Sequence, residues 1–198
     1  MLLLNYLLCS NNASWLIVVD NDKFKKITSK LINKNPYWEY LIDEYYLPNG
    51  NIGKYYYVHT NGSVMIIPQT EDNRFILTKQ YRFLDKKFSI EFPGGGIKNN
   101  STAFESALDE LKEETGAIAS EIYKIGEFNP FNGVTDEICN VFLAKVSEFT
   151  SQSLDESEEI EILQLSLDEI VSKIKSGEIY DGMTISAFAI YYVSKVLN

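Results

Sequence analysis

The sequence has 198 residues and 45% hydrophobic content, which suits one ordinary domain with an extension and excludes a wholly disordered chain. Its 18 Lys or Arg and 28 Asp or Glu residues give a formal net charge of −10. We therefore expect no nucleic-acid coating role, because binding to phosphate backbones needs a basic surface.

Residues 1–37 are interpreted as an N-terminal extension, whose role the sequence does not reveal. Residues 1–9 are mainly apolar and could be a secretory signal or a lipoprotein start with Cys9 as the acceptor. Neither is favoured, because no Lys or Arg precedes the stretch and Asn5 and Tyr6 interrupt it. The stretch is also far shorter than the ~20 apolar residues that span a bilayer. Residues 15–19 are predicted to form a strand, because a turn signal follows at 20–22. The two cysteines, Cys9 and Cys139, stand far apart and exclude a disulfide scaffold or a zinc ribbon. We expect a cytoplasmic protein without membrane contact.

Several strands are predicted in the first half of the chain, over residues 55–59, 63–68 and 74–80. Between the first two, Asn61-Gly62 is a dipeptide that favours a tight hairpin. The tyrosines at 55–57 could stack on a base, but core packing is the favoured interpretation, because alternation would bury one face of the strand. The single histidine, His59, is interpreted as a structural or surface residue.

A helix is predicted over residues 102–115, directly after three glycines at 94–96. Thr102 and Glu105 form a capping-box pattern at its start, and Gly116 supplies the stop. The glycines allow the backbone a close approach to a neighbouring group.

The remainder of the chain predicts strands at 122–128, 138–146 and 162–165, with a polar excursion at 147–161. Two amphipathic helices follow, at 167–176 and 184–197. The predicted order along the chain is several strands, one helix, more strands and two terminal helices. This order indicates a mixed α/β layered domain rather than a βαβ repeat.

Three carboxylates lie on one face of the predicted 102–115 helix: Glu110, Glu113 and Glu114. Like charges at this spacing destabilise a helix, and a divalent cation is the simplest compensation. All-oxygen ligands suit Mg²⁺ or Mn²⁺. The helix alone leaves open a solvated acidic face. The glycines just upstream favour a metal or phosphate site.

The segment from Gly95 to Ala117 resembles the Nudix hydrolase signature, G-x5-E-x7-R-E-U-x-E-E-x-G-U, where U is a bulky aliphatic residue. Gly95, Glu110, Glu113, Glu114 and Gly116 occupy matching positions. Three positions depart from the signature: Ser101 stands for its first Glu, Asp109 for its Arg, and Ala117 for its final aliphatic residue.

Further segments are similar to the ADP-ribose and nucleoside-diphosphate-sugar pyrophosphatases of that family. In chain order these are residues 47–50, Gln80-Tyr81-Arg82, residues 91–95, residues 130–137, residues 141–144 and residues 177–184. Matching segments therefore run from about residue 38 to about residue 190.

The resemblance implies an α/β/α sandwich with a mixed β-sheet over residues 38–198, preceded by the extension at 1–37. It also implies a homodimer, with the extension and the aromatic-rich residues 38–57 at the contact between copies.

The resemblance also assigns roles to individual residues. Glu110, Glu113 and Glu114 would hold Mg²⁺, helped by backbone of Gly94 or Gly95. Glu137 would act as general base, although a solvated carboxylate at a strand start is an equal alternative.

Two further side chains would contact the substrate or support the site. Arg82 would contact the diphosphate or a ribose, since a guanidinium suits phosphate recognition. A surface arginine paired with a nearby acid is its alternative. Glu91 would support the site or add a metal contact.

The implied activity is Mg²⁺-dependent hydrolysis of the pyrophosphate in ADP-ribose or a related nucleoside-diphosphate sugar, with Mn²⁺ as a substitute metal. The alternative is a catalytically weak nucleotide-binding or sensor module, which Ser101 and Asp109 favour. With both departures, we expect an enzyme that needs more Mg²⁺ than a relative with the full signature.

Overall fold

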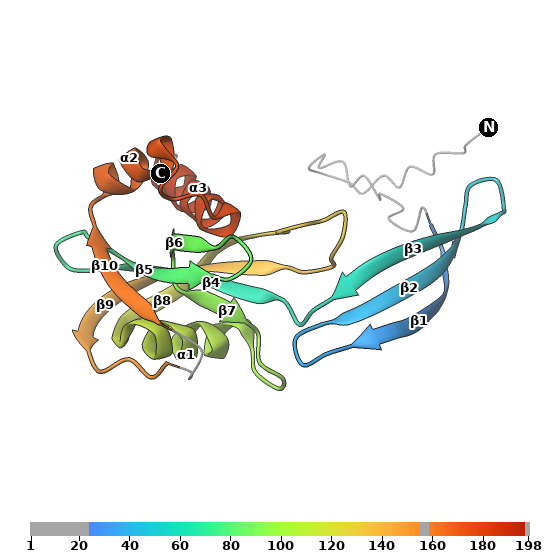
Figure 1. The fold of residues 1–198 in the computed structure, drawn as a ribbon, viewed down its shortest axis with the longest axis horizontal. Coiled ribbons are helices and arrows are strands. Elements are labelled where there is room, and N and C mark those ends of the chain that lie inside the picture. Colours follow the sequence, from blue (N-terminus) through green and yellow to red (C-terminus); the bar gives the residue numbers. More distant parts are fainter. Residues whose placement is uncertain (1–23, 155–158, 197–198) are drawn as a thin grey trace, which may run out of the picture.

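The computed structural model describes residues 24–154 and 159–196, and its chain order is shown by colour in Figure 1. These residues form two sheets and three helices. The strands are β1 (Lys26–Lys34), β2 (Glu39–Tyr46), β3 (Ile52–His59), β4 (Ser63–Gln69), β5 (Phe75–Arg82), β6 (Lys87–Glu91), β7 (Gly94–Gly96), β8 (Ala117–Phe128), β9 (Cys139–Phe149) and β10 (Ile160–Leu165). The helices are α1 (Ala103–Thr115), α2 (Leu167–Ser176) and α3 (Gly182–Val196).

The larger sheet has the strand order β10-β5-β4-β9-β8, with β6 added on β5 and β7 added on β4. β4 and β9 run parallel, whereas the other pairs are antiparallel. The sheet is therefore mixed, as predicted.

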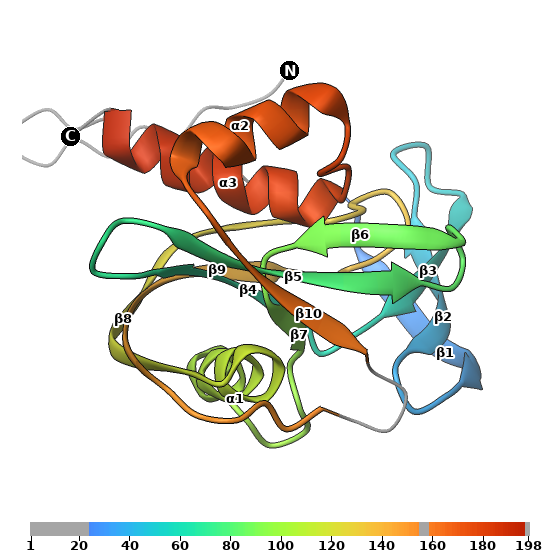
Figure 2. The same cartoon turned by 60° about the vertical axis from the view of Figure 1, so that its left-hand side comes forward.

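Helices cover both faces of this sheet, and Figure 2 shows α1 on one side with α2 and α3 on the other. Successive side chains of β4 alternate between the two cores. Val64 and Ile66 pack with Leu111 of α1, while Met65 and Ile67 pack in the core that α2 and α3 share. Because both faces are covered, the first six residues of β4 are buried. The α/β/α sandwich is confirmed.

Helix α1 begins and ends at the predicted residues. Thr102 accepts a hydrogen bond from the Glu105 amide, and the Glu105 side chain accepts one from the Thr102 amide, which completes the capping box. Gly116 ends the helix with φ +68°, and its amide donates to the Lys112 carbonyl. Local signals therefore define this helix, and its register fixes where its carboxylates lie.

The predicted hairpin at Asn61-Gly62 is wrong. The strand before it, β3, belongs to the smaller sheet, whereas the strand after it, β4, belongs to the larger one. Gly62 does adopt a left-handed φ of +90°, which favours glycine at this position. Residues 60–62 instead carry the chain from one sheet to the other, because β4 takes β9 and β7 as partners and not β3.

The smaller sheet, here called the arm, consists of β1, β2 and β3 in that order, and it extends away from the larger sheet (Figure 1). The predicted boundary at residue 37 falls between β1 and β2, two paired strands of the arm, and it stays a prediction. The strand predicted at 15–19 lies outside the described residues.

Core packing of the tyrosine run at 55–57 is a wrong interpretation for this chain. Tyr55 and Tyr56 are 46% and 54% exposed, and neither belongs to a core cluster formed by the described residues. Within the described residues, no helix is long and apolar enough to span a membrane. The cytoplasmic location stays a prediction.

Two glycines at helix ends provide a matched test of the fold. We expect Gly177→Ala to lower the free energy of unfolding by about 1–2 kcal/mol, because its φ of +79° is left-handed and the added Cβ meets nothing within 4 Å. Gly116→Ala should cost about 3 kcal/mol or more, since its Cβ would also lie 2.1 Å from the Thr150 carbonyl oxygen. Urea unfolding measures both, and equal losses would contradict this account.

Candidate functional site

The candidate site is built where β7 meets the start of β4 and the carboxylate face of α1. β7 pairs antiparallel with β4, so Gly94, Gly95 and Gly96 lie opposite Met65, Val64 and Ser63. A side chain at Gly94 would meet the Val64 carbonyl oxygen at 2.3 Å. Glycine is therefore required for the two strands to approach this closely.

Glu110 packs directly against the backbone of Gly95. A Cβ at Gly95 would lie 2.6–2.9 Å from the Glu110 carboxylate oxygens. The glycine thus leaves a recess that the carboxylate fills, and it brings backbone groups of β7 next to an acidic side chain.

Glu114 is also held by this strand. The Gly94 amide donates a 3.1 Å hydrogen bond to Glu114 Oε2, and the residue is only 6% exposed. A buried carboxylate needs such partners, because an unpaired buried charge is expensive.

Glu113 lies farther toward solvent and pairs with a lysine. Lys98 Nζ donates to both carboxylate oxygens of Glu113, at 3.0 and 2.9 Å. This hydrogen bonding raises the pKa of Lys98, and the charges of Glu110 and Asp109 raise it further. Lys98 therefore stays protonated near the acidic face of α1.

The donor chemistry fits a hard divalent cation, since Glu110, Glu113, Glu114 and the backbone of β7 supply oxygen ligands. The recess at Gly95 is the observation that supports this fit. Among the described residues, however, no three acidic, histidine or cysteine side chains are gathered as a ready metal cluster. The carboxylates have separate partners, and Glu113 in particular is turned to Lys98.

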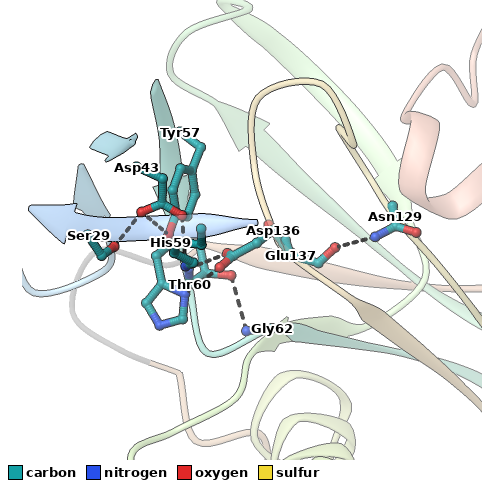
Figure 3. Close-up of polar contacts among 10 residues, drawn as sticks. Ser29, Asp43, Tyr57, His59, Thr60, Gly62, Asn129, Asp136 and Glu137 are labelled. Atoms are coloured by element: carbon teal, nitrogen blue, oxygen red, sulfur yellow. Dashed lines mark hydrogen bonds and ion pairs between the residues drawn. The ribbon is translucent and has the colours of Figure 1, made fainter. Parts of the chain in front are cut away.

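Glu137 is brought to the start of β4 by the loop before β9. Ser63 Oγ donates a 2.6 Å hydrogen bond to Glu137 Oε1. Asn129 donates to the Glu137 carbonyl, as Figure 3 shows. Ser63 is itself opposite Gly96 of β7. The predicted base candidate is thus half-buried and oriented at the edge of the same site.

The next strand begins at Cys139, beside this base candidate. Burial raises the pKa of the Cys139 thiol to about 11, so the thiol is protonated and unreactive at neutral pH. Cys139 therefore contributes packing beside the site and no nucleophile.

Arg82 and Glu91 face each other across the β5–β6 pair. Arg82 Nε donates to Glu91 Oε1 at 2.8 Å, and its Nη2 donates to the other oxygen. Glu91 is buried, while the Arg82 side chain is 47% exposed. The hydrogen bonds that Arg82 donates to Glu91 raise the pKa of Arg82, and the charges of Asp181 and Glu114 raise it further. Arg82 is therefore a fixed cation with an exposed edge beside the acidic site.

The start of α3 is joined to the loop that follows Glu91. Thr184, which is fully buried, accepts a hydrogen bond from the Phe92 amide, and its own amide donates to Asp181. Asp181 thereby caps α3 and lies near Arg82.

The arm meets the loop before Glu137 through several contacts (Figure 3). His59 Nδ1 lies 2.7 Å from Asp136 Oδ2, and Val58 pairs through its backbone with the loop. His59 is thus a structural residue, as interpreted from the sequence.

A groove of about 300 Å³ lies at this junction, lined by Lys26, Asp43, Tyr55, Tyr57, Thr135 and Asp136. None of the α1 carboxylates lines it. Its Asp43 is already paired with Lys26 and Tyr57. We therefore place the candidate chemistry at α1 and β7 rather than in this groove.

Three residues of the site were not predicted as such: Lys98, Ser63 and Asp181. Lys98 and Ser63 each act through a partner distant in sequence, so no local pattern marks them. Asp181 did carry a signal, since it lies in the 177–184 segment that matches the pyrophosphatases.

Comparisons with known proteins match this chain to one family and to several relatives. The model of the NUDIX domain family matches residues 59–184, a range that includes every predicted site residue. The ADP-ribose pyrophosphatase of Bacillus subtilis (strain 168) is 32% identical over 171 residues, which cover 85% of this chain and 91% of the relative. The methanol dehydrogenase activator of Bacillus methanolicus is 32% identical over 159 residues, covering 79% and 86%.

A solved structure shares the fold. The crystal structure of an ADP compounds hydrolase superposes with a TM-score of 0.73 at 20% identity, and covers 88% of this chain and 94% of the other. At this identity, the likeness supports the fold alone.

The three glycines of β7 should respond differently to the same substitution. We expect Gly94→Ala to destabilise the fold by about 2–3 kcal/mol, because its Cβ would meet backbone of β4. Gly95→Ala should cost about 1 kcal/mol or less, yet displace the Glu110 carboxylate and weaken Mn²⁺ binding. Thermal unfolding and Mn²⁺ titration measure these effects.

Gly96→Ala is the control, since its Cβ would meet nothing within 4 Å. Unchanged Mn²⁺ binding in Gly95→Ala, or a loss of the same size in Gly96→Ala, would contradict the role of the recess.

Proposed function

Because this chain belongs to the NUDIX family, we propose that it hydrolyses the pyrophosphate of ADP-ribose or a related nucleoside-diphosphate sugar in a Mg²⁺-dependent reaction. The observation that carries the proposal is the packing of Glu110 into the Gly95 recess, with Glu114 bonded to the next glycine. This arrangement sets oxygen ligands from α1 beside strand backbone, as a site for a cation and a diphosphate requires.

The diphosphate of the substrate would be bound mainly by electrostatic attraction to a cation. A diphosphate is an anion, and the α1 face is itself acidic, so positive charge must be supplied between them. Glu110, Glu113, Glu114 and backbone of Gly94 or Gly95 would hold Mg²⁺. When bound, the cation would stabilise charge on the phosphoryl oxygens and lower the pKa of a coordinated water.

Glu137 would accept the proton of the attacking water. Its hydrogen bond from Ser63 fixes one carboxylate oxygen, so the carboxylate is already oriented. The water oxygen forms a bond to one phosphorus, the bridging P–O bond breaks, and two phosphate monoesters result.

Arg82 would contact the diphosphate or a ribose with its exposed edge. Its bidentate pair with buried Glu91 holds the guanidinium in one orientation. Glu91 would therefore act through Arg82, as a positioning residue.

A second candidate function is nucleotide binding without efficient turnover. Ser101 and Asp109 depart from the signature, and one relative is named as an activator of another enzyme. Under this candidate the chain would bind a nucleotide as a sensor or interaction module.

We expect turnover of ADP-ribose or another nucleotide sugar with Mg²⁺ and none with a chelator. Glu113→Gln and Glu114→Gln should each lower this activity by about 100-fold or more, since each loses a ligand charge. The fold should be retained, because removing a carboxylate relieves repulsion along α1. A panel of nucleotide sugars, scored by phosphate release in a coupled assay, provides the measurement.

Glu121→Gln is the matched control, because Glu121 pairs with Lys145 on the surface of β8 and β9. Full activity in either Glu113→Gln or Glu114→Gln would remove the ligand assignment. Nucleotide binding without turnover at saturating Mg²⁺ would establish the second candidate instead.

We also propose that two copies of the chain pair through their arms. Every residue of β1 is exposed, and the arm presents Leu31, Ile32, Trp38 and Tyr56 to solvent. An exposed apolar surface of this kind marks an interface. Lys26 pairs with Asp43 and Lys34 pairs with Glu39 within one chain, so these charges are already neutralised next to the apolar side chains. A two-fold contact would bring the same apolar surface of both copies together.

Light scattering at micromolar concentration should give the mass of a dimer. We expect Leu31→Asp to weaken the dimer by about tenfold or more, because it puts a charge on an apolar contact surface. Leu84→Asp is the control, since Leu84 is 89% exposed in the β5–β6 turn of the larger sheet. A monomeric parent chain would overturn the proposal.

A further inference from the structure

Lys98 lies where a cation bound by Glu113 would lie. Its ammonium contacts both oxygens of that carboxylate, which are the atoms a metal would need. The charges of Glu110 and Asp109 also act on it. The lysine thus neutralises part of an α1 face that carries several carboxylates.

The turn that carries Lys98 is fixed by hydrogen bonds to the start of β4. The Ile97 amide donates to the Gly62 carbonyl at 2.9 Å, and the Asn61 side chain donates to Ile97 and to Asn99. The turn is closed by the Ser101 amide, which donates to the Lys98 carbonyl at 3.1 Å. The backbone around Lys98 is therefore held against the residues that precede β4.

The Lys98–Glu113 pair is nonetheless accessible and exchangeable. The two side chains are 46% and 43% exposed, so water and salt weaken their attraction. A divalent cation has twice the charge of an ammonium and attracts the carboxylate more strongly.

We propose that Lys98 is a built-in counterion that holds Glu113 when no divalent cation is bound and competes with that cation for the carboxylate. The inference rests on the proposed function for the identity of the metal ligands. It assigns Lys98 as a residue that tunes metal affinity, without contact to the reacting atoms. Binding of the metal would require Glu113 to leave Lys98.

Lys98→Met tests this, because methionine keeps an unbranched side chain and removes the charge. We expect Lys98→Met to bind Mn²⁺ about three- to tenfold more tightly than the parent chain at low ionic strength. Its metal-free form should melt at a lower temperature, and Mn²⁺ should raise that temperature by more than in the parent. Electron paramagnetic resonance of free Mn²⁺ and thermal unfolding, both without substrate, give the two readouts.

Two further variants serve as controls. Lys98→Arg keeps the charge and should bind Mn²⁺ as the parent does. Lys112→Met removes the same charge from an exposed position on α1 and should change the affinity by less than about twofold. Raising the ionic strength should narrow the difference between Lys98→Met and the parent.

Equal or weaker Mn²⁺ binding in Lys98→Met would overturn the proposal, as would an equal gain in Lys112→Met. Failure of every variant to bind Mn²⁺ would overturn both this proposal and the metal site. Tighter binding in Lys98→Met without hydrolysis of any nucleotide sugar would support the counterion and contradict only the proposed activity.

Discussion

The close approach of β7 to β4 and to α1 is the constraint on which the site depends. It exists because Gly94 and Gly95 carry no side chain, so a carbonyl of β4 and the carboxylate of Glu110 fill the space instead. The capped ends of α1 then fix which carboxylates face the strand. Glu114 bonds to the strand and Glu113 points toward solvent. The contact between β7 and α1 thus explains why Glu114 is more buried than Glu113.

Four acidic side chains of the site each have a hydrogen-bond or ion-pair partner, because an unpaired carboxylate is costly to bury. Glu91 is held by Arg82, Glu114 by a backbone amide, Glu137 by Ser63 and Glu113 by Lys98. The partners differ in strength, since Glu91 and Glu114 are buried while the Lys98–Glu113 pair is partly exposed to solvent, which weakens its attraction. The most easily exchanged contact of the site therefore lies on its solvent side.

The sequence predicts those features that local signals determine. The start and end of α1 follow from Thr102, Glu105 and Gly116, and residues 64–68 of β4 are apolar because both faces of the strand are covered. The partner of a strand is not a local property, which is why Asn61-Gly62 indicates the left-handed glycine correctly but a hairpin wrongly. β1 escaped prediction because it mixes lysines with scattered apolar residues and buries neither face. Long-range pairs such as Lys98 with Glu113 carry no sequence pattern.

The loop before β9 contacts both the arm and the candidate site. Its first half is bonded to the arm through Gly133, Val134 and Asp136, and the next residue is Glu137. The contacts with the arm therefore lower the conformational entropy of the loop that carries Glu137. A contact that restrains the arm would therefore also restrict the positions of Glu137, although the contact itself would be made at the arm and not at Glu137. The arm and the carboxylate of Glu137 are therefore coupled through this loop.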